Sequence, residues 1–202
     1  MTSLETSHFN NRPKVAIIIP CYRAKERLQK VVEDAKKNLS FIKESFQYKI
    51  IIVNDACPLR SWEYINGDHH IKIIHNEYNL GVGASTIKGF KYAMQKGFDA
   101  VIKLDADGQH PPKYLKELIP FIFSLPKYKL FLIKGNRYKI KIFNKPIPLL
   151  RKIGTLFLDP IARAALGYRG LSDITNGFLA MDSKTANFLL NSKCGIEIEK
   201  RY

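Results

Sequence analysis

The stretch VAIIIP, from Val15 to Pro20, is a short run of apolar, mostly β-branched residues that ends in a proline. It lacks the alternation of polar and apolar residues that is typical of a strand with one solvent-exposed face. We therefore predict a strand buried on both faces of a parallel sheet. From Leu28 to Leu39, apolar residues recur at steps of three and four, which predicts a helix with one apolar stripe. Together they predict a strand–helix unit.

The same alternation continues along the chain. Ile87, Phe90 and Met94 indicate a second helix, which Gly97 can end. The repeated pattern predicts an α/β fold with a Rossmann-like, mostly parallel central sheet flanked by helices. In such sheets, ligands bind beyond the carboxyl ends of the strands. Further buried strands are predicted at Lys49–Val53 (KIIIV), Ile71–His75 (IKIIH), Ala100–Leu104 (AVIKL) and Leu130–Lys134 (LFLIK).

Length and composition limit the function classes. The 202 residues predict one domain, residues 13–202, after a polar extension at residues 1–12. The net charge of +15 favours an anionic partner, such as a phosphate, a nucleic acid or an acidic lipid surface, although it could serve solubility alone. Three cysteines without a zinc-binding pattern favour a reducing compartment. No apolar run approaches the ~20 residues that span a bilayer, and the first residues lack the apolar core of a signal peptide.

Acidic residues follow two of the predicted strands. Asp55 follows the second strand, and Asp105 and Asp107 follow the fourth. We expect Asp55 and Asp105 to leave adjacent strand ends and to share a pocket, although separate structural turns would also explain them. Carboxylates two residues apart on an extended segment project to one side, so Asp105 and Asp107 could approach one Mg²⁺ or Mn²⁺ ion. Such an ion can bridge the two phosphates of a nucleoside diphosphate.

The sequence around these residues resembles the family-2 glycosyltransferases of the GT-A fold, and within them the dolichol-phosphate mannose synthases and bacterial polyprenyl-phosphate sugar transferases. The resemblance extends over nearly the whole chain in the order of the family's motifs, and the segment at residues 101–112 is its most specific part. The matching stretches are VAIIIPCYRAKERL, IIIVNDACP, NEYNLGVGASTIKGFKYAM, VIKLDADGQHPP, IKGNRY and SDITNGFLAMD.

The resemblance implies a nucleotide pocket. Asp55 would contact the base or ribose of the sugar donor, and Pro20, Cys21 and Tyr22 would line the pocket. The family often has Asn-Glu after this tyrosine, whereas here the segment Arg23–Glu26 (RAKE) follows, which leaves the contacts to the base open.

The resemblance also implies a metal–diphosphate centre that depends on Mg²⁺ or Mn²⁺. Asp105, with Ala106 beside it, would lie near the ribose and the ion. Asp107 and Gln109 would ligate the ion, the amide oxygen adding a neutral hard ligand. Arg137, at the basic exit of the fifth predicted strand, would meet a donor or acceptor phosphate, unless it is an ordinary surface arginine.

The reaction implied is an inverting sugar transfer from GDP-mannose or a UDP-sugar to a polyprenyl or dolichyl phosphate. Arg151 matches a family arginine implicated in phosphate binding. Asp173, in SDITNGFLAMD, would orient or deprotonate the acceptor, or would instead cap a helix or turn. We expect catalysis to depend on Asp105, Asp107, Arg137 and Asp173.

Residues 140–166 mix lysines and arginines with large apolar residues. This composition is typical of an interfacial helix on an anionic membrane, and equally of an amphipathic helix packed on the sheet. The first interpretation predicts a cytoplasmic protein held peripherally at the inner face of a membrane. Family members usually continue beyond the position of Tyr202, so we expect a domain truncated at its C-terminus, or an acceptor site completed differently.

Two further interpretations compete with lipid-linked transfer. The acceptor could be a saccharide hydroxyl of a surface polysaccharide or lipopolysaccharide. The charge alone could indicate a nucleic-acid-binding protein, but no helix-turn-helix, zinc-finger or RNA-binding signature supports it. The segment NLGVGAS resembles a dinucleotide fingerprint only weakly, because Thr86 occupies the place of the third glycine.

Overall fold

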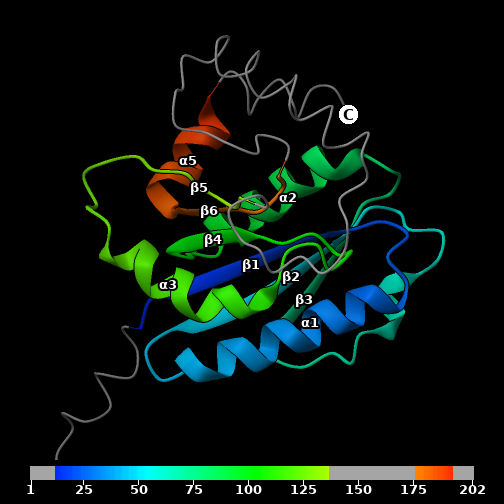
Figure 1. Ribbon diagram of the computed structural model, residues 1–202. Helices are drawn as coiled ribbons and strands as arrows, with labels where there is room; N and C mark the ends of the chain where they lie inside the picture. Colours follow the sequence, from blue (N-terminus) through cyan, green and yellow to red (C-terminus); the bar gives the residue numbers. More distant parts are fainter. Residues whose placement is uncertain (1–11, 137–175, 193–202) are drawn as a thin grey trace, which may run out of the picture.

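The computed structural model describes residues 12–136 and 176–192 (Figure 1). Its centre is a six-stranded sheet in the order β3-β2-β1-β4-β6-β5. The first four strands are parallel, whereas β6 pairs antiparallel with both β4 and β5. This confirms the predicted α/β fold with a mostly parallel sheet. The strands are β1 (Lys14–Cys21), β2 (Gln47–Asn54), β3 (Ile71–His75), β4 (Ala100–Lys103), β5 (Ile133–Lys134) and β6 (Leu179–Asp182).

Helices cover both faces of the sheet, with α1 and α3 on one side and α2 and α5 on the other (Figure 1). Alternate residues of β1 serve the two layers: Ile17 and Ile19 pack toward α1, and Ile18 packs toward α2. This is why the strand reads as an uninterrupted apolar run. The helices are α1 (Glu26–Leu39), α2 (Gly81–Gln95), α3 (Leu115–Ser124) and α5 (Ser183–Asn191), with single 3₁₀ turns at Ser40–Ile42, Ser61–Tyr64 and Pro112–Tyr114.

Gly97 ends helix α2 as the sequence predicts, but the helix begins before Ile87, the first residue that indicated it. At its end, Gly97 has a φ of 68°, its N–H bonds to the carbonyl of Met94, and the N–H of Phe98 bonds to that of Ala93. This pair of bonds is the Schellman arrangement, in which a glycine takes the left-handed position. At its start, the helix extends back to Gly81, whose φ of 83° turns the chain into it.

Three features differ from the predicted organisation. The strand expected at Leu130–Lys134 is reduced to Ile133–Lys134, the only residues of it that pair with β6. The elements α3, β6 and α5 were not predicted. The expectation that Asp55 and Asp105 leave adjacent strands is wrong, because β2 and β4 lie on opposite sides of β1. Among the described residues, no helix is long and apolar enough to cross a membrane.

Close packing of α2 on the sheet predicts a large penalty for Gly89→Ala. A methyl group at Gly89 would collide with Cγ2 of Ile18 and lie 3.2 Å from Cγ2 of Val53. We expect this overpacking to lower the free energy of unfolding by about 1–3 kcal/mol, despite the better helix propensity of alanine. Urea denaturation measures it, with Gly67→Ala as the control, since nothing lies within 4 Å of that position. A stabilised Gly89→Ala protein would contradict the packing described here.

Candidate functional site

A pocket of about 180 Å³ lies beyond the carboxyl ends of β1, β2 and β4. Every residue expected to bind the sugar donor lies on its wall, although those residues come from the end of β1 and from the separate loops that follow β1, β2 and β4. The placement agrees with the rule for open α/β sheets. The lining residues are Pro20, Cys21, Tyr22, Ala24, Arg27, Asp55, Val82, Asp105, Ala106 and Asp107.

Asp55 connects the end of β2 to the start of α2. Asp55 is buried, with only 2% of its surface exposed. Oδ1 accepts hydrogen bonds from Nδ2 of Asn76 at 2.7 Å and from the backbone N–H of Leu80 at 2.8 Å, and Oδ2 accepts one from the N–H of Gly81 at 2.9 Å. The first amides of a helix have no partner within it, and a carboxylate both satisfies them and complements the helix dipole. Asp55 is therefore an anchor for α2 as well as a part of the pocket wall.

Asp105 is paired with a buried lysine that the sequence analysis treated only as part of a strand. Nζ of Lys103, a residue 6% exposed, lies 2.5 Å from Oδ1 of Asp105 and donates to the carbonyl of Gly177 at 3.1 Å. Lysine is rarely buried without a partner, so the lysine inside the apolar run AVIKL could have indicated a buried ion pair. Two residues apart at a strand end, Lys103 and Asp105 meet on one side of the sheet.

His110 closes the loop that follows β4. Its Nδ1 accepts a hydrogen bond from the backbone N–H of Asp105 at 3.0 Å, and its Nε2 lies 3.4 Å from Oδ2 of that residue. Because Nδ1 is an acceptor, the proton of the neutral ring is assigned to Nε2, which faces the carboxylate. Burial lowers the pKa of His110, although the charge of Asp105 acts in the opposite direction. A neutral His110 thus fixes the position of Asp105.

Asp107 is exposed and lies in a turn, not on an extended segment. Strand β4 ends at Lys103, and Gly108 has a φ of 79°. The carboxylate accepts a hydrogen bond from the backbone N–H of Gln109 at 2.9 Å and otherwise faces the pocket. The expectation that Asp105 and Asp107 project to one side of an extended segment is therefore wrong. The turn after β4 brings both residues to the pocket.

The residues present suit a hard divalent ion. In the described part of the chain, no cluster of three or more His, Cys, Asp or Glu side chains is arranged to hold a metal by itself. The open carboxylate of Asp107 and the side-chain amide of Gln109 nevertheless offer the oxygen ligands that Mg²⁺ and Mn²⁺ prefer. A nucleoside diphosphate would supply further oxygens.

Two loops lie along the side of the pocket formed by Tyr22, Ala24 and Asp55, and side-chain acceptors hold the loops together. The N–H of Arg23 donates to Sγ of Cys57 at 3.1 Å, and the N–H of Lys25 donates to Oγ of Ser61 at 2.8 Å. Both donors have positive φ angles, of 52° and 51°, which non-glycine residues adopt only when the surroundings hold them. Burial raises the pKa of Cys21, on the pocket wall, to about 12, so its thiol stays protonated. The segment RAKE, which departs from the family pattern, therefore has a fixed backbone.

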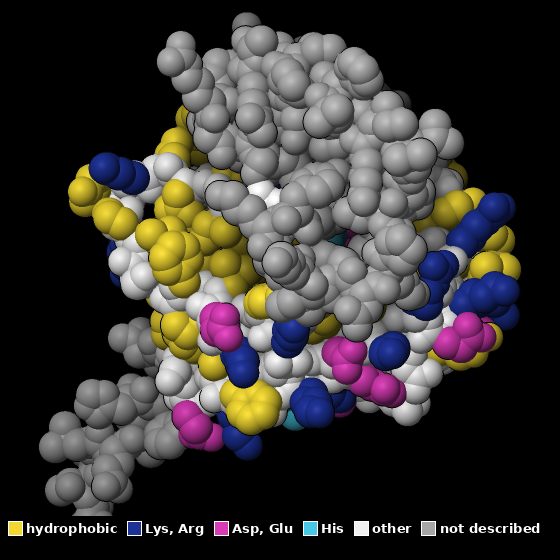
Figure 2. All heavy atoms as spheres, viewed as in Figure 1, with side chains coloured by type: hydrophobic (Ala, Val, Ile, Leu, Met, Phe, Trp, Pro, Cys, Tyr) yellow, Lys and Arg dark blue, Asp and Glu magenta, His cyan; other side chains and the backbone are white. Residues whose placement is uncertain are grey.

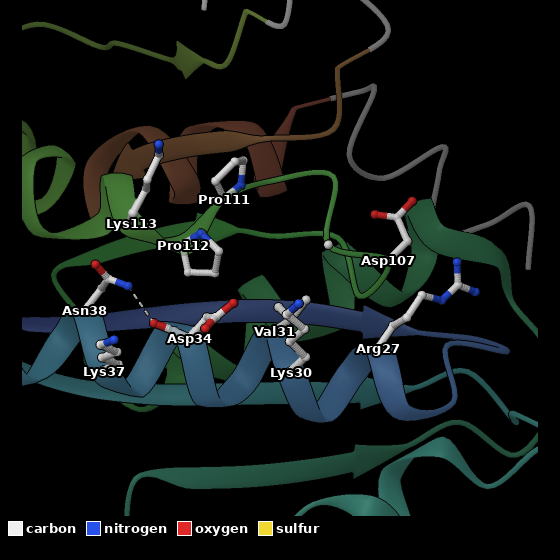
Figure 3. Close-up of a pocket in the computed structure, with 11 residues that line it drawn as sticks. Arg27, Lys30, Val31, Asp34, Lys37, Asn38, Asp107, Pro111, Pro112 and Lys113 are labelled. Carbon is white, nitrogen blue, oxygen red and sulfur yellow. Dashed lines mark hydrogen bonds between the residues drawn. The ribbon is translucent and has the colours of Figure 1, made fainter. Parts of the chain in front are cut away.

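Arg27 is a site residue that the sequence analysis missed. It extends from the first turn of α1 on the side of Asp107, and the two residues also line a neighbouring groove of about 620 Å³ (Figure 3). A guanidinium beside an open carboxylate at the pocket mouth can contact phosphate oxygens. Its only signal in the sequence was its place shortly after the first strand.

The residues predicted to bind phosphate or the acceptor lie outside the described residues. These are Arg137, Arg151 and Asp173, and the basic and apolar segment at residues 140–166 lies there as well.

Comparisons with known proteins identify the family of this chain. The model of the family described as "Glycosyl transferase family 2" matches residues 16–184. The chain is similar to the dolichol-phosphate mannosyltransferase of Pyrococcus furiosus, with 28% identity over 189 residues, or 92% of this chain and 51% of the relative. It is also 29% identical over 189 residues to the UDP-N-acetylglucosamine–dolichyl-phosphate N-acetylglucosaminyltransferase of Methanococcus voltae, covering 89% of this chain and 73% of the relative. The chain thus spans about half the length of the Pyrococcus protein.

A solved structure shares the fold. The glucosyl-3-phosphoglycerate synthase of Mycobacterium tuberculosis, crystallised with Mn²⁺, UDP and phosphoglyceric acid, superposes with a TM-score of 0.50 over 88% of this chain and 58% of its own, at 14% identity. At this identity the similarity concerns the fold alone.

Proposed function

Since the chain belongs to glycosyl transferase family 2, we propose that it transfers a sugar, with inversion, from a nucleoside-diphosphate sugar to a polyprenyl or dolichyl phosphate. The observation that carries the proposal is the pocket at the carboxyl ends of the parallel strands, which Asp55, Asp105 and Asp107 all line. This is where an open α/β sheet binds a nucleotide. GDP-mannose and UDP-sugars are the candidate donors.

The donor half of the reaction depends on the loop after β4. Asp107 and Gln109 would hold Mg²⁺ or Mn²⁺, which, when bound, stabilises the negative charge of the departing diphosphate. Arg27 would contact the same phosphates from α1. Pro20 and Tyr22 would line the space for the nucleoside, with Asp55 holding the start of α2 against it.

The acceptor half rests on the relatives and on the predicted basic residues. Both curated relatives are named for a dolichyl phosphate. A phosphate oxygen is already ionised at neutral pH, so residues that position it can replace a general base. Arg137 and Arg151 would position the phosphate, Asp173 would orient it, and residues 140–166 would lie on the anionic inner face of a membrane.

No observation favours the other two interpretations. Transfer to a saccharide hydroxyl would use the same donor pocket. The nucleic-acid interpretation rests on net charge alone, and on the face shown in Figure 2 the Lys and Arg side chains over α1 are interspersed with Asp and Glu. Such mixing differs from the basic stripe that tracks a phosphate backbone.

A thermal-shift experiment tests the donor half. We expect GDP or UDP, and the corresponding sugar nucleotides, to raise the melting temperature only when Mn²⁺ is present, because a ligand that binds the native state stabilises it. Labelled sugar should then pass into organic-extractable lipid when polyprenyl phosphate is added. Transfer to a glycan with no lipid product would overturn the proposed acceptor, and no nucleotide binding with any metal would overturn the donor site.

A further inference from the structure

Lys103 places a positive charge beside Asp105, one of the carboxylates of the proposed metal centre. Its ammonium group lies 2.5 Å from Oδ1 of Asp105, in a residue only 6% exposed. Screening by water and salt is weak at such a site, so the interaction is stronger than that of a surface pair. Oδ2 of the same carboxylate faces Nε2 of His110. Both residues line the pocket, but both oxygens of Asp105 face a charged or ring-nitrogen partner, whereas the described hydrogen bond of the Asp107 carboxylate is the one from the backbone N–H of Gln109.

The pair of Lys103 and Asp105 packs against Gly177, where a side chain would not fit. A methyl group added to Gly177, just before β6, would lie 2.6 Å from Nζ of Lys103 and 2.8 Å from Oδ2 of Asp105. The carbonyl of Gly177 also accepts a hydrogen bond from Nζ. The ammonium group is therefore held by two partners from distant parts of the chain, and any movement away from them would break its contact with Oδ1 of Asp105.

We propose that Lys103 is a positioning residue and a built-in counter-ion, which neutralises Asp105 so that Asp107 is left as the principal direct ligand of the divalent ion. The inference rests on the proposed donor site. The two carboxylates and the ammonium group together carry one net negative charge. A single open carboxylate holds a divalent ion weakly, and ligand charge count is a main determinant of such affinities. The ion then binds firmly only when the donor diphosphate adds its own oxygens.

Binding of Mn²⁺ in the absence of nucleotide measures this effect without an activity assay. Lys103→Met removes the charge from a site lined by apolar strand residues. We expect it to tighten the binding of free Mn²⁺ about tenfold, since the ammonium group beside Asp105 would no longer repel an ion held by Asp107. Electron paramagnetic resonance of free Mn²⁺ gives the dissociation constant. The control is Lys72→Met, an exposed strand lysine on β3, which changes the net charge equally and should leave the constant unchanged.

A charge-compensating pair separates this role from a merely structural one. Asp105→Asn alone leaves the ammonium group unopposed and should weaken the binding of free Mn²⁺. The double variant Lys103→Met with Asp105→Asn restores the original net charge, so its dissociation constant should return to within about threefold of the wild-type value. A structural defect at Lys103 would not be repaired in this way.

Three outcomes would overturn the proposal: unchanged or weaker Mn²⁺ binding by Lys103→Met, no recovery in the double variant, or loss of folding in both Lys103→Met and Lys103→Gln. The glutamine variant removes the charge but keeps a donor for the carbonyl of Gly177. The proposed function fails differently, by absence of Mn²⁺-dependent nucleotide binding in the wild-type protein. If the wild-type protein binds nucleotide but Lys103→Met binds free Mn²⁺ with an unchanged dissociation constant, the proposed function is kept and only the counter-ion role of Lys103 is rejected.

Discussion

Asp107→Asn is expected to abolish most Mn²⁺-dependent binding of a nucleoside diphosphate while leaving the fold intact. The substitution deletes a full negative charge at nearly constant volume. The asparagine oxygen can still accept the hydrogen bond from the N–H of Gln109, so the turn keeps its closure. We expect a loss of at least about 100-fold in nucleotide affinity, measured by calorimetry in the presence of Mn²⁺. The free energy of unfolding should change by no more than about 0.5 kcal/mol, as is usual at exposed positions.

Asp34→Asn provides the matched control for that experiment. Asp34 lies on α1 and lines the neighbouring groove together with Asp107, but it does not line the donor pocket. The same change of charge there should leave the nucleotide affinity close to that of the wild-type protein. Equal losses in the two variants would mean that general electrostatics, and not a metal ligand, control the affinity. An unaltered Mn²⁺-dependent affinity in Asp107→Asn would remove its proposed role.

The centre of the fold could be predicted from the sequence because the signals there are local. Strands β1, β2 and β4 are buried on both faces, and so their apolar residues form uninterrupted runs. Helix α3 carries Pro120 in its interior, a residue that usually argues against a helix. The apolar run at Leu130–Lys134 indicated β5 but not its length, and β6 was not predicted, because both depend on antiparallel pairing between distant segments.

The acidic residues of the pocket could also be predicted, but not their partners. Asp55, Asp105 and Asp107 stood out as acidic residues after apolar strands. The pairing of Lys103 with Asp105 is completed by Gly177, which is 74 positions away from Lys103. Similarly, the bonds of Asp55 to Leu80 and Gly81 depend on how the start of α2 is placed against β2. Motif spacing identifies chemical groups; only the packed fold determines which of their oxygens remain open.

Asp55→Asn is expected to give the largest loss of stability at the site. The carboxylate accepts hydrogen bonds from Nδ2 of Asn76 and from two backbone amides of α2, so every partner is a donor. An asparagine would turn its NH₂ group toward at least one of these donors and break that hydrogen bond at the start of α2. We expect the free energy of unfolding to fall by about 3 kcal/mol, measured by urea denaturation.

The control for this prediction is Asp99→Asn. Asp99 also accepts a hydrogen bond from a backbone amide, that of Lys14 at 2.8 Å, but it is exposed, and we expect a loss of no more than about 1 kcal/mol. The paired experiment also decides between two roles for Asp55. The family resemblance implies that Asp55 contacts the base or ribose. If that were its only role, Asp55→Asn would lower nucleotide affinity without lowering the free energy of unfolding. A stability loss larger than that of Asp99→Asn would instead identify Asp55 as the anchor of α2, and any loss of nucleotide affinity would then follow from displacement of the helix that borders the pocket.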